Sequence, residues 1–164
     1  MVRPFDEGDL VSVGRVHALS RRAAYDGLVP AAALARVTPE SQVDVWRERT
    51  SFDDTTVLVA EQGETVVGFV SLLQTPDGTE LDAIHLLPDV VGTGAGSALM
   101  AAAVEHARAL GLRTLHVFVV AGNERARAFY RRTGWKLTGP AGTHDIGGAE
   151  VDIVRYRLTL GSDL

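Results

Sequence analysis

A glycine-rich segment lies between an apolar run and a predicted helix near the middle of the chain. Residues 80–87 have the composition of a β-strand, glycine occupies alternate positions at Gly92, Gly94 and Gly96, and an apolar periodic stretch follows at residues 97–110. Glycine lets backbone N–H groups turn toward a ligand, and a helix start adds unpaired N–H groups and partial positive charge. The segment therefore predicts a strand, an anion-binding loop and a helix in series, with phosphate or pyrophosphate as the natural ligand.

Two common phosphate-binding loops are excluded by the spacing. A Walker A loop needs a lysine directly after its last glycine, and none follows here. A dinucleotide fingerprint needs a third glycine five positions after the first, but Ser97 and Leu99 stand there when the count starts at Gly92 or Gly94. The loop is thus of another kind, or is a turn without a ligand.

Hydrophobic periodicity and capping residues divide the rest of the chain. Asp6, Thr38 and Asn123 are candidate helix N-caps, and Gly111 and Gly134 follow the ends of two predicted helices. Turn residues separate the predicted strands of the first half, which we expect to form an antiparallel meander. We expect helices at residues 7–24, 39–49, 97–110 and 123–133, and strands at residues 2–5, 56–61, 66–73, 80–87, 115–120 and 150–158. This order predicts one continuous α/β domain over residues 1–164, a mixed sheet with helices on both faces.

Composition limits the partners that such a domain would have. The 164 residues include 16 basic and 21 acidic side chains, a net charge of −5, which argues against nucleic acid or an anionic membrane surface as a partner. No cysteine is present, and the histidines show no spacing typical of metal ligands, so no metal site is expected. No segment has the length and hydrophobicity of a signal peptide or a membrane span, and a cytoplasmic location is the expectation.

The glycine segment resembles a motif of the GNAT superfamily of acetyl-CoA-dependent N-acetyltransferases. Residues 91–96 are similar to motif A of that family, with Val91 in place of the usual Gln or Arg. Residues 123–135, from Asn123 through Tyr130 to Gly134 and Trp135, are similar to motif B, and residues 2–10 to the first strand and helix. The resemblance covers nearly the whole chain. It implies a mostly antiparallel sheet of six to seven strands, about four helices, and two central strands that splay apart.

The same resemblance implies where acetyl-CoA would bind. The loop amides would hold the pyrophosphate, the strand before the loop would bind the pantetheine arm, and residues 119–123 would form the opposite wall. Val91 removes one polar contact, which implies a modest affinity for CoA. The implied cofactor-binding residues are Leu86, Leu87, Val91, Gly92, Thr93, Gly94, Ala95, Gly96, Ser97 and Asn123.

Acyl transfer to an amine needs a base for the amine and a donor for the departing thiolate. The resemblance implies Tyr130 as the general acid or hydrogen-bond donor at sulfur, and Glu80 as the base, acting directly or through a water molecule. His85 is an alternative base because an imidazole titrates near neutral pH. Strand alternation predicts that Asp82 and Ile84 share the face of Glu80 and that His85 lies on the other face.

The acceptor side is expected to involve Tyr25, Asp82, His85 and His144. Residues 22–30 resemble a segment of small bacterial members of the family, in which a tryptophan usually occupies the position of Arg21. We expect His144 in a loop, residues 142–148. The acidic residues Asp26, Glu80, Asp82 and Asp145 suggest a negatively charged cleft that would suit a cationic amine.

Three functional hypotheses follow from these residues. The first is an N-acetyltransferase that transfers the acetyl group of acetyl-CoA to a primary amine of a small molecule. The second is a CoA-binding module of the same fold without catalysis, which Val91 favours. The third is a protein or peptide N-terminal acetyltransferase with an open acceptor groove. Whether the protein forms a homodimer is left open.

Overall fold

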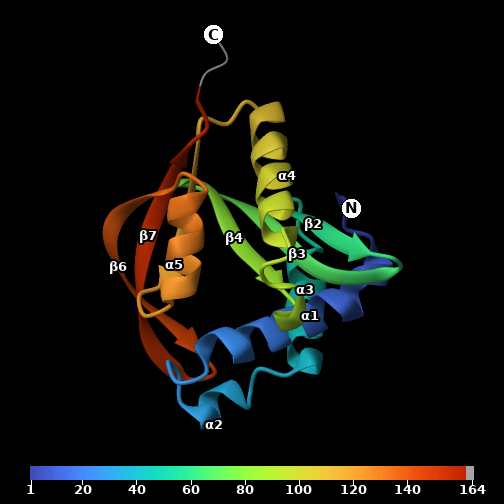
Figure 1. The fold of residues 1–164 in the computed structure, drawn as a ribbon, viewed down its shortest axis with the longest axis vertical. Coiled ribbons are helices and arrows are strands. Elements are labelled where there is room, and N and C mark those ends of the chain that lie inside the picture. Colours follow the sequence, from blue (N-terminus) through green and yellow to red (C-terminus); the bar gives the residue numbers. More distant parts are fainter. Residues whose placement is uncertain (162–164) are drawn as a thin grey trace.

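The chain folds into a seven-stranded sheet with helices on both faces (Figure 1). This computed structural model describes residues 1–161. The strands pair in the order β1-β2-β3-β4-β5-β7-β6, and all neighbours are antiparallel except β4 and β5. The strands are β1 (Val2–Pro4), β2 (Thr55–Gln62), β3 (Thr65–Thr75), β4 (Gly78–Leu86), β5 (Thr114–Val120), β6 (Lys136–Ile146) and β7 (Ala149–Thr159). The helices are α1 (Leu10–Tyr25), α2 (Ala31–Leu34), α3 (Pro39–Arg49), α4 (Ala95–Ala109) and α5 (Glu124–Arg132), with 3-10 turns η1 (Glu7–Asp9) and η2 (Pro88–Val90).

The predicted fold class is confirmed by this arrangement. The four longer helices lie where the periodicity places them, and the short helix α2 and the two 3-10 turns are additional. The last three residues of the predicted domain, 162–164, lie outside the described residues. No helix within residues 1–161 is long and apolar enough to cross a membrane.

Two adjacent residues of β3 face the two helical layers on opposite sides of the sheet. The Phe69 ring contacts His17 of α1 and Trp46 of α3, with ring centroids 6.0 and 5.0 Å apart. A Cβ atom on the neighbouring Gly68 would lie 3.2 Å from Leu99 of α4. Because consecutive strand residues point to opposite faces, α1 and α3 cover one face of the sheet and α4 covers the other.

The predicted N-caps hold the helix starts in place. The Asp6 carboxylate accepts from a backbone N–H group of η1, which leads directly into α1. The Thr38 hydroxyl oxygen accepts from the Ser41 N–H at 3.0 Å, and the Asn123 Oδ1 accepts from the Ala126 N–H at 3.2 Å. Each contact satisfies a backbone donor that the helix itself leaves unpaired.

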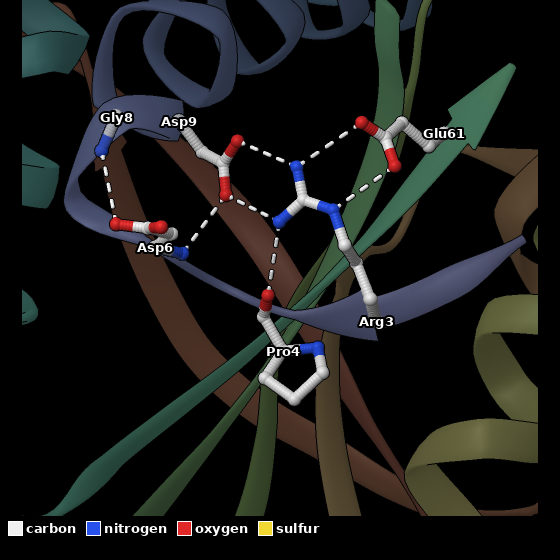
Figure 2. Close-up of polar contacts among 6 residues, drawn as sticks. All are labelled: Arg3, Pro4, Asp6, Gly8, Asp9 and Glu61. Atoms are coloured by element: carbon white, nitrogen blue, oxygen red, sulfur yellow. Dashed lines mark hydrogen bonds and ion pairs between the residues drawn. The ribbon is translucent and has the colours of Figure 1, made fainter. Parts of the chain in front are cut away.

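Arg3 joins the first strand to the first helical turn and to β2 (Figure 2). Its Nη1 and Nη2 atoms each lie 2.8 Å from an oxygen of Asp9, and its Nε lies 3.0 Å from Glu61 Oε2. The hydrogen bond from Arg3 lowers the pKa of the Asp9 and Glu61 carboxyl groups. This planar fork fixes the entry of the chain into α1.

Strands β4 and β5 diverge, as the sequence resemblance implies. They are parallel, and Glu80 with His116 is their one recorded Cα pair within the described residues. Beyond that pair, toward the glycine loop, no further Cα pair joins the two strands within residues 1–161. The split leaves a gap in the centre of the sheet, on which the candidate site is built.

A bulge in β4 corrects the predicted placement of His85. Leu72 of β3 pairs with Leu81, but the next residue, Ser71, pairs with Ala83, so Asp82 is an extra residue in β4. The bulge interrupts the alternation of side chains. As a result, Asp82 bonds to Arg49 of α3 and His85 bonds to Ser20 of α1, and both side chains face the α1–α3 layer. The prediction that His85 lies on the other face was therefore wrong.

The segment before the last strand is a strand, which the sequence prediction missed. Residues 136–146 form β6, which pairs with β7, and His144 lies opposite Val151 rather than in a loop. The pairing shifts register around Gly139 and Pro140. Because β6 is at the edge of the sheet, a proline without an N–H group is tolerated there.

Candidate active site

One cavity occupies the gap between β4 and β5. It has a volume of about 750 Å³, within the range of roughly 300–1,000 Å³ that is usual for small-molecule sites. Its walls come from α1, β4, the glycine loop, β5, α5 and the β6–β7 hairpin. We call the part lined by Gly92, Gly94, Gly96 and Ser97 the glycine end, and the part lined by Arg21, Tyr25, Glu80, Asp82 and His144 the α1 end.

The glycine end presents backbone donors at the start of α4. Gly92 and Gly94 have φ angles of 84° and 94°, which glycine adopts at little cost, and Gly94 is the N-cap of the helix. Within residues 1–161, the N–H groups of Gly92, Gly94, Gly96 and Ser97 form no hydrogen bond. Unpaired donors at a helix N-terminus create a site for an anion.

Most of the predicted cofactor-binding residues line the cavity. Leu86, Val91 and Asn123 line it together with the glycine loop, whereas Leu87, Thr93 and Ala95 do not. The Leu87 N–H donates to the Val67 carbonyl oxygen at 2.8 Å, within the sheet. The Thr93 hydroxyl donates to the Val90 carbonyl oxygen at 2.6 Å and closes the loop from outside.

Tyr130 reaches the cavity from α5 and is 5% exposed. Its ring packs against Trp135 and Tyr156, with centroids 5.5 and 6.0 Å apart. Its hydroxyl group forms no hydrogen bond within the described residues. Burial raises the pKa of Tyr130, so its proton stays on oxygen at neutral pH.

Glu80 is half-buried at the α1 end and forms no ion pair within residues 1–161. Burial raises the pKa of its carboxyl group, the nearby Asp82 raises it further, and Arg49 acts in the opposite direction. Asp82 itself is paired with Arg49, whose guanidinium lies 4.9 Å from the centre of the Trp46 ring. A carboxylate that has lost water without gaining a cation is a stronger base than usual.

His85 is held in a buried aromatic cluster. Its Nδ1 lies 2.9 Å from the Ser20 hydroxyl, and its ring is 4.4 Å from that of His17. His17 Nδ1 in turn accepts from the Trp46 indole N–H at 2.8 Å. Burial lowers the pKa of His85 to about 3. An imidazole with so low a pKa is a weak base, which favours Glu80 over His85 for proton removal.

The charge at the α1 end differs from the sequence prediction. Asp26 and Asp145 do not line the cavity, and Asp82 is neutralised by Arg49. Arg21, by contrast, lines the cavity without an ion pair among the described residues. Tyr25 and His144 complete this wall. The predicted negatively charged cleft is therefore not what the structure shows.

Sequence reasoning did not assign a role to Arg21 or Arg49. The signal for Arg21 was present, because it replaces the tryptophan usual in the resembling segment and lies four residues before Tyr25, on the same side of a helix. Arg49 gave no local signal, since its partner Asp82 is 33 residues away.

Solved structures share this architecture. PaiA N-acetyltransferase from Thermoplasma acidophilum, in complex with coenzyme A, superposes with a TM-score of 0.75 at 19% identity, covering 97% of this chain and 98% of that one. The structure of yncA from Salmonella typhimurium with its cofactor acetyl-CoA gives a TM-score of 0.74 at 17% identity, covering 100% and 95%. At these identities the similarity shows the fold.

Sequence comparison defines the family. An uncharacterized N-acetyltransferase of Mycobacterium tuberculosis is 36% identical over 84 residues, 51% of this chain and 54% of that relative. This chain thus spans about half the length of that relative. The family model for the acetyltransferase (GNAT) family matches residues 23–135, and the chain belongs to that family.

Proposed function

We propose that the protein is an acetyl-CoA-dependent N-acetyltransferase that acts on a primary amine of a small molecule. The observation that carries this proposal is a single cavity that contains both the unpaired amides of the glycine loop and the side chains of Glu80 and Tyr130. Donor and acceptor can thus meet in one place, which direct transfer requires.

The glycine end fits the diphosphate of acetyl-CoA. The N–H groups of Gly92, Gly94, Gly96 and Ser97 are free to bind phosphate oxygens, and the α4 N-terminus adds favourable electrostatics. Leu86 and Val91 offer an apolar wall beside them. Acetyl-CoA supplies an activated acyl group as a thioester, and the two structural neighbours described above were solved with coenzyme A or acetyl-CoA.

Glu80 prepares the amine. An ammonium group has no lone pair, so it must lose a proton before it attacks a carbonyl carbon. The raised pKa of Glu80 makes its carboxylate a better acceptor for that proton, directly or through water. In the transfer, the amine nitrogen bonds to the acyl carbon, the carbon–sulfur bond breaks, and the second amine proton is released.

Tyr130 stabilises the departing thiolate. A thiol has a pKa of about 8.5 and an unperturbed phenol about 10, and burial raises the pKa of Tyr130 further. The phenol is thus a weaker acid than the thiol. This order favours a hydrogen bond from the hydroxyl to sulfur over complete proton transfer.

The walls of the α1 end favour a small acceptor. Arg21, Tyr25, Asp82 and His85 are all half-buried there, and the β6–β7 hairpin adds His144. An extended peptide would need an open groove instead.

A panel of primary amines, peptides and acetyl-CoA, with thiol release as the signal, tests this function. We expect thiol release that depends on a small amine, and its loss in Glu80→Gln. Saturable acetyl-CoA binding without turnover of any amine or peptide would support a non-catalytic module. Turnover of peptides alone would support an N-terminal acetyltransferase.

A further inference from the structure

Arg21 is a half-buried cation without a partner among the described residues. Its Nε is shielded from solvent and forms no hydrogen bond, and none of its guanidinium nitrogens forms a hydrogen bond or ion pair within residues 1–161. An arginine remains charged in proteins, and a buried charge that nothing pairs is unfavourable. The side chain nevertheless lines the cavity, so a group bound there can pair with its guanidinium.

The carboxylate best placed to neutralise Arg21 is already used. Asp82 forms its ion pair with Arg49, and Arg49 also lies over the Trp46 ring. The other wall residues of the α1 end are an aromatic hydroxyl, Tyr25, and the imidazoles of His85 and His144, whose pKa values are lowered by burial. Among the described residues, Arg21 is therefore the one unpaired cation at this end and Glu80 the one unpaired acid.

Arg21 is on the acceptor side of the cavity rather than beside the glycine loop. It projects from α1, and the titratable groups nearest to it in effect are Tyr25, Arg49 and Asp82. The glycine loop instead adjoins Phe129 of α5, which a Cβ on Gly96 would approach to 3.5 Å. A group bound by Arg21 would thus belong to the acceptor and not to the phosphates of CoA.

We propose that Arg21 binds a carboxylate of the acceptor, which is a primary amine of the amino-acid type. This inference rests on the proposed function and names its substrate class. A guanidinium binds a carboxylate through two parallel hydrogen bonds, and a single charge of −1 matches the single unpaired cation. Glu80 takes one proton from the ammonium group, the amine nitrogen bonds to the acyl carbon as the carbon–sulfur bond breaks, and CoA leaves as its thiolate. The second amine proton is released to solvent, and the carboxylate stays unchanged in the N-acetyl amino acid. A cationic diamine would instead place a further positive charge beside Arg21.

Matched acceptors test this assignment. Each of the common amino acids is compared with its carboxamide and with the amine formed by its decarboxylation, at saturating acetyl-CoA. We expect the best acceptor to be an amino acid, with kcat/KM higher than that of its carboxamide by roughly ten- to a hundredfold. Aminoalkyl phosphates in the same panel separate a phosphate group from a carboxylate, and a preference for them would overturn the assignment.

Variants of α1 connect the preference to Arg21. In Arg21→Gln the KM for the amino acid should rise by roughly ten- to a hundredfold, with the carboxamide and acetyl-CoA unaffected, and Arg21→Lys should recover part of the loss. Arg15→Gln, on an exposed position of the same helix, is the control and should leave all constants unchanged. Because Arg21→Gln removes an unpaired buried charge, the melting temperature without ligands should not fall.

The outcomes separate this inference from the proposed function. If no acetyl-CoA binds and no amine is acetylated, the proposed function fails and the inference falls with it. If amines are acetylated but carboxamides or diamines react as well as amino acids, in wild type and Arg21→Gln alike, only the carboxylate assignment is wrong. If acetyl-CoA binds without turnover, the carboxylate assignment is tested by titrating N-acetyl amino acids into the protein with CoA present. Equal affinity of wild type and Arg21→Gln for these products overturns the assignment.

Discussion

The pKa of the Glu80 carboxyl group is set first by burial and then by two charged neighbours. Burial and Asp82 raise the pKa of its carboxyl group, while Arg49 lowers it. A base acts in its deprotonated form, so the acidic limb of kcat/KM should lie above the ordinary pKa of a glutamate. Glu80 and Asp82 are two residues apart in β4 and both line the cavity, which couples their charges.

Substitution of Glu80 tests the role of this carboxylate. Glu80→Gln should lower kcat by roughly a hundredfold, the usual size of a general-base effect, and leave acetyl-CoA affinity unchanged. Arg49→Gln should move the acidic limb to higher pH, because Arg49 lowers the pKa of Glu80. Steady-state rates from pH 5 to 9 measure both effects, and Glu64→Gln in an exposed turn is the control. An unshifted limb in Arg49→Gln would show that another group is the base.

Two tyrosines with rings in contact should respond in opposite ways to loss of the hydroxyl group. Tyr130→Phe removes a hydroxyl that has no hydrogen-bond partner within residues 1–161, so activity should fall while the free energy of unfolding hardly changes. Tyr156→Phe removes an acceptor of the Arg127 Nε–H at 3.0 Å. It should cost about 1 kcal/mol of stability and leave activity intact. Urea unfolding and thiol release are measured on both variants. Loss of stability in Tyr130→Phe together with loss of activity in Tyr156→Phe would contradict the account.

At the scale of elements, two glycines of similar conformation flank α4. Gly94 caps its start with φ 94°, and Gly111 follows its end with φ 77°. A Cβ at either position would meet no atom within 4 Å, so alanine brings backbone strain without a clash in the free protein.

Alanine substitutions at these two glycines distinguish an effect on acetyl-CoA binding from an effect on helix stability. Gly94→Ala and Gly111→Ala should each lower the free energy of unfolding by about 1 kcal/mol, the cost of positive φ for a residue with a Cβ. Gly94→Ala alone should also weaken acetyl-CoA binding, because its Cβ occupies the approach to the loop amides. Calorimetric titration of both variants measures this, and equal affinities would remove the loop from the donor site.

Sequence reasoning succeeded for elements whose determinants are local. Strand β4, the glycine loop and α4 follow each other within residues 78–109, and their caps and periodicity are visible in the sequence. The same reasoning missed β6, because Gly139, Pro140 and Gly142 hide its alternation and only pairing with β7 makes it a strand. It also misplaced His85, because the bulge at Asp82 is defined by pairing with β3. The charge of the cleft depended on the long-range pair of Arg49 with Asp82, which no local pattern encodes.

At the scale of the whole molecule, buried imidazoles connect stability to pH. Burial lowers the pKa of His17, whose Nδ1 accepts from Trp46, and of His85 beside it. The unfolded chain binds protons at these residues below about pH 6.5, whereas the folded protein does not until far lower pH. Stability should therefore fall as the pH drops through 6.5. The pKa values of Asp9 and Glu61 are lowered by Arg3, so a further loss of stability follows in more acidic solution, where these carboxylates are protonated and their ion pairs with Arg3 break.

His17→Gln isolates one of these contributions. Between pH 7 and pH 5, a buried imidazole that stays neutral costs about 2 kcal/mol of stability. The difference in unfolding free energy between the two pH values should be smaller in His17→Gln by about that amount. The raised pKa values of Glu80 and Asp82 act in the opposite direction but are common to both proteins. Urea unfolding at the two pH values measures the difference, with His106→Gln as control, and an unchanged difference would contradict a neutral His17.

The whole account depends on a donor site in the gap between β4 and β5. Isothermal titration of the purified protein with acetyl-CoA tests this most directly, with Gly94→Ala and Gly111→Ala titrated in parallel. We predict one saturable site per chain with an affinity near the micromolar range, weakened in Gly94→Ala and unchanged in Gly111→Ala. Absence of saturable binding to the wild-type protein would contradict the account.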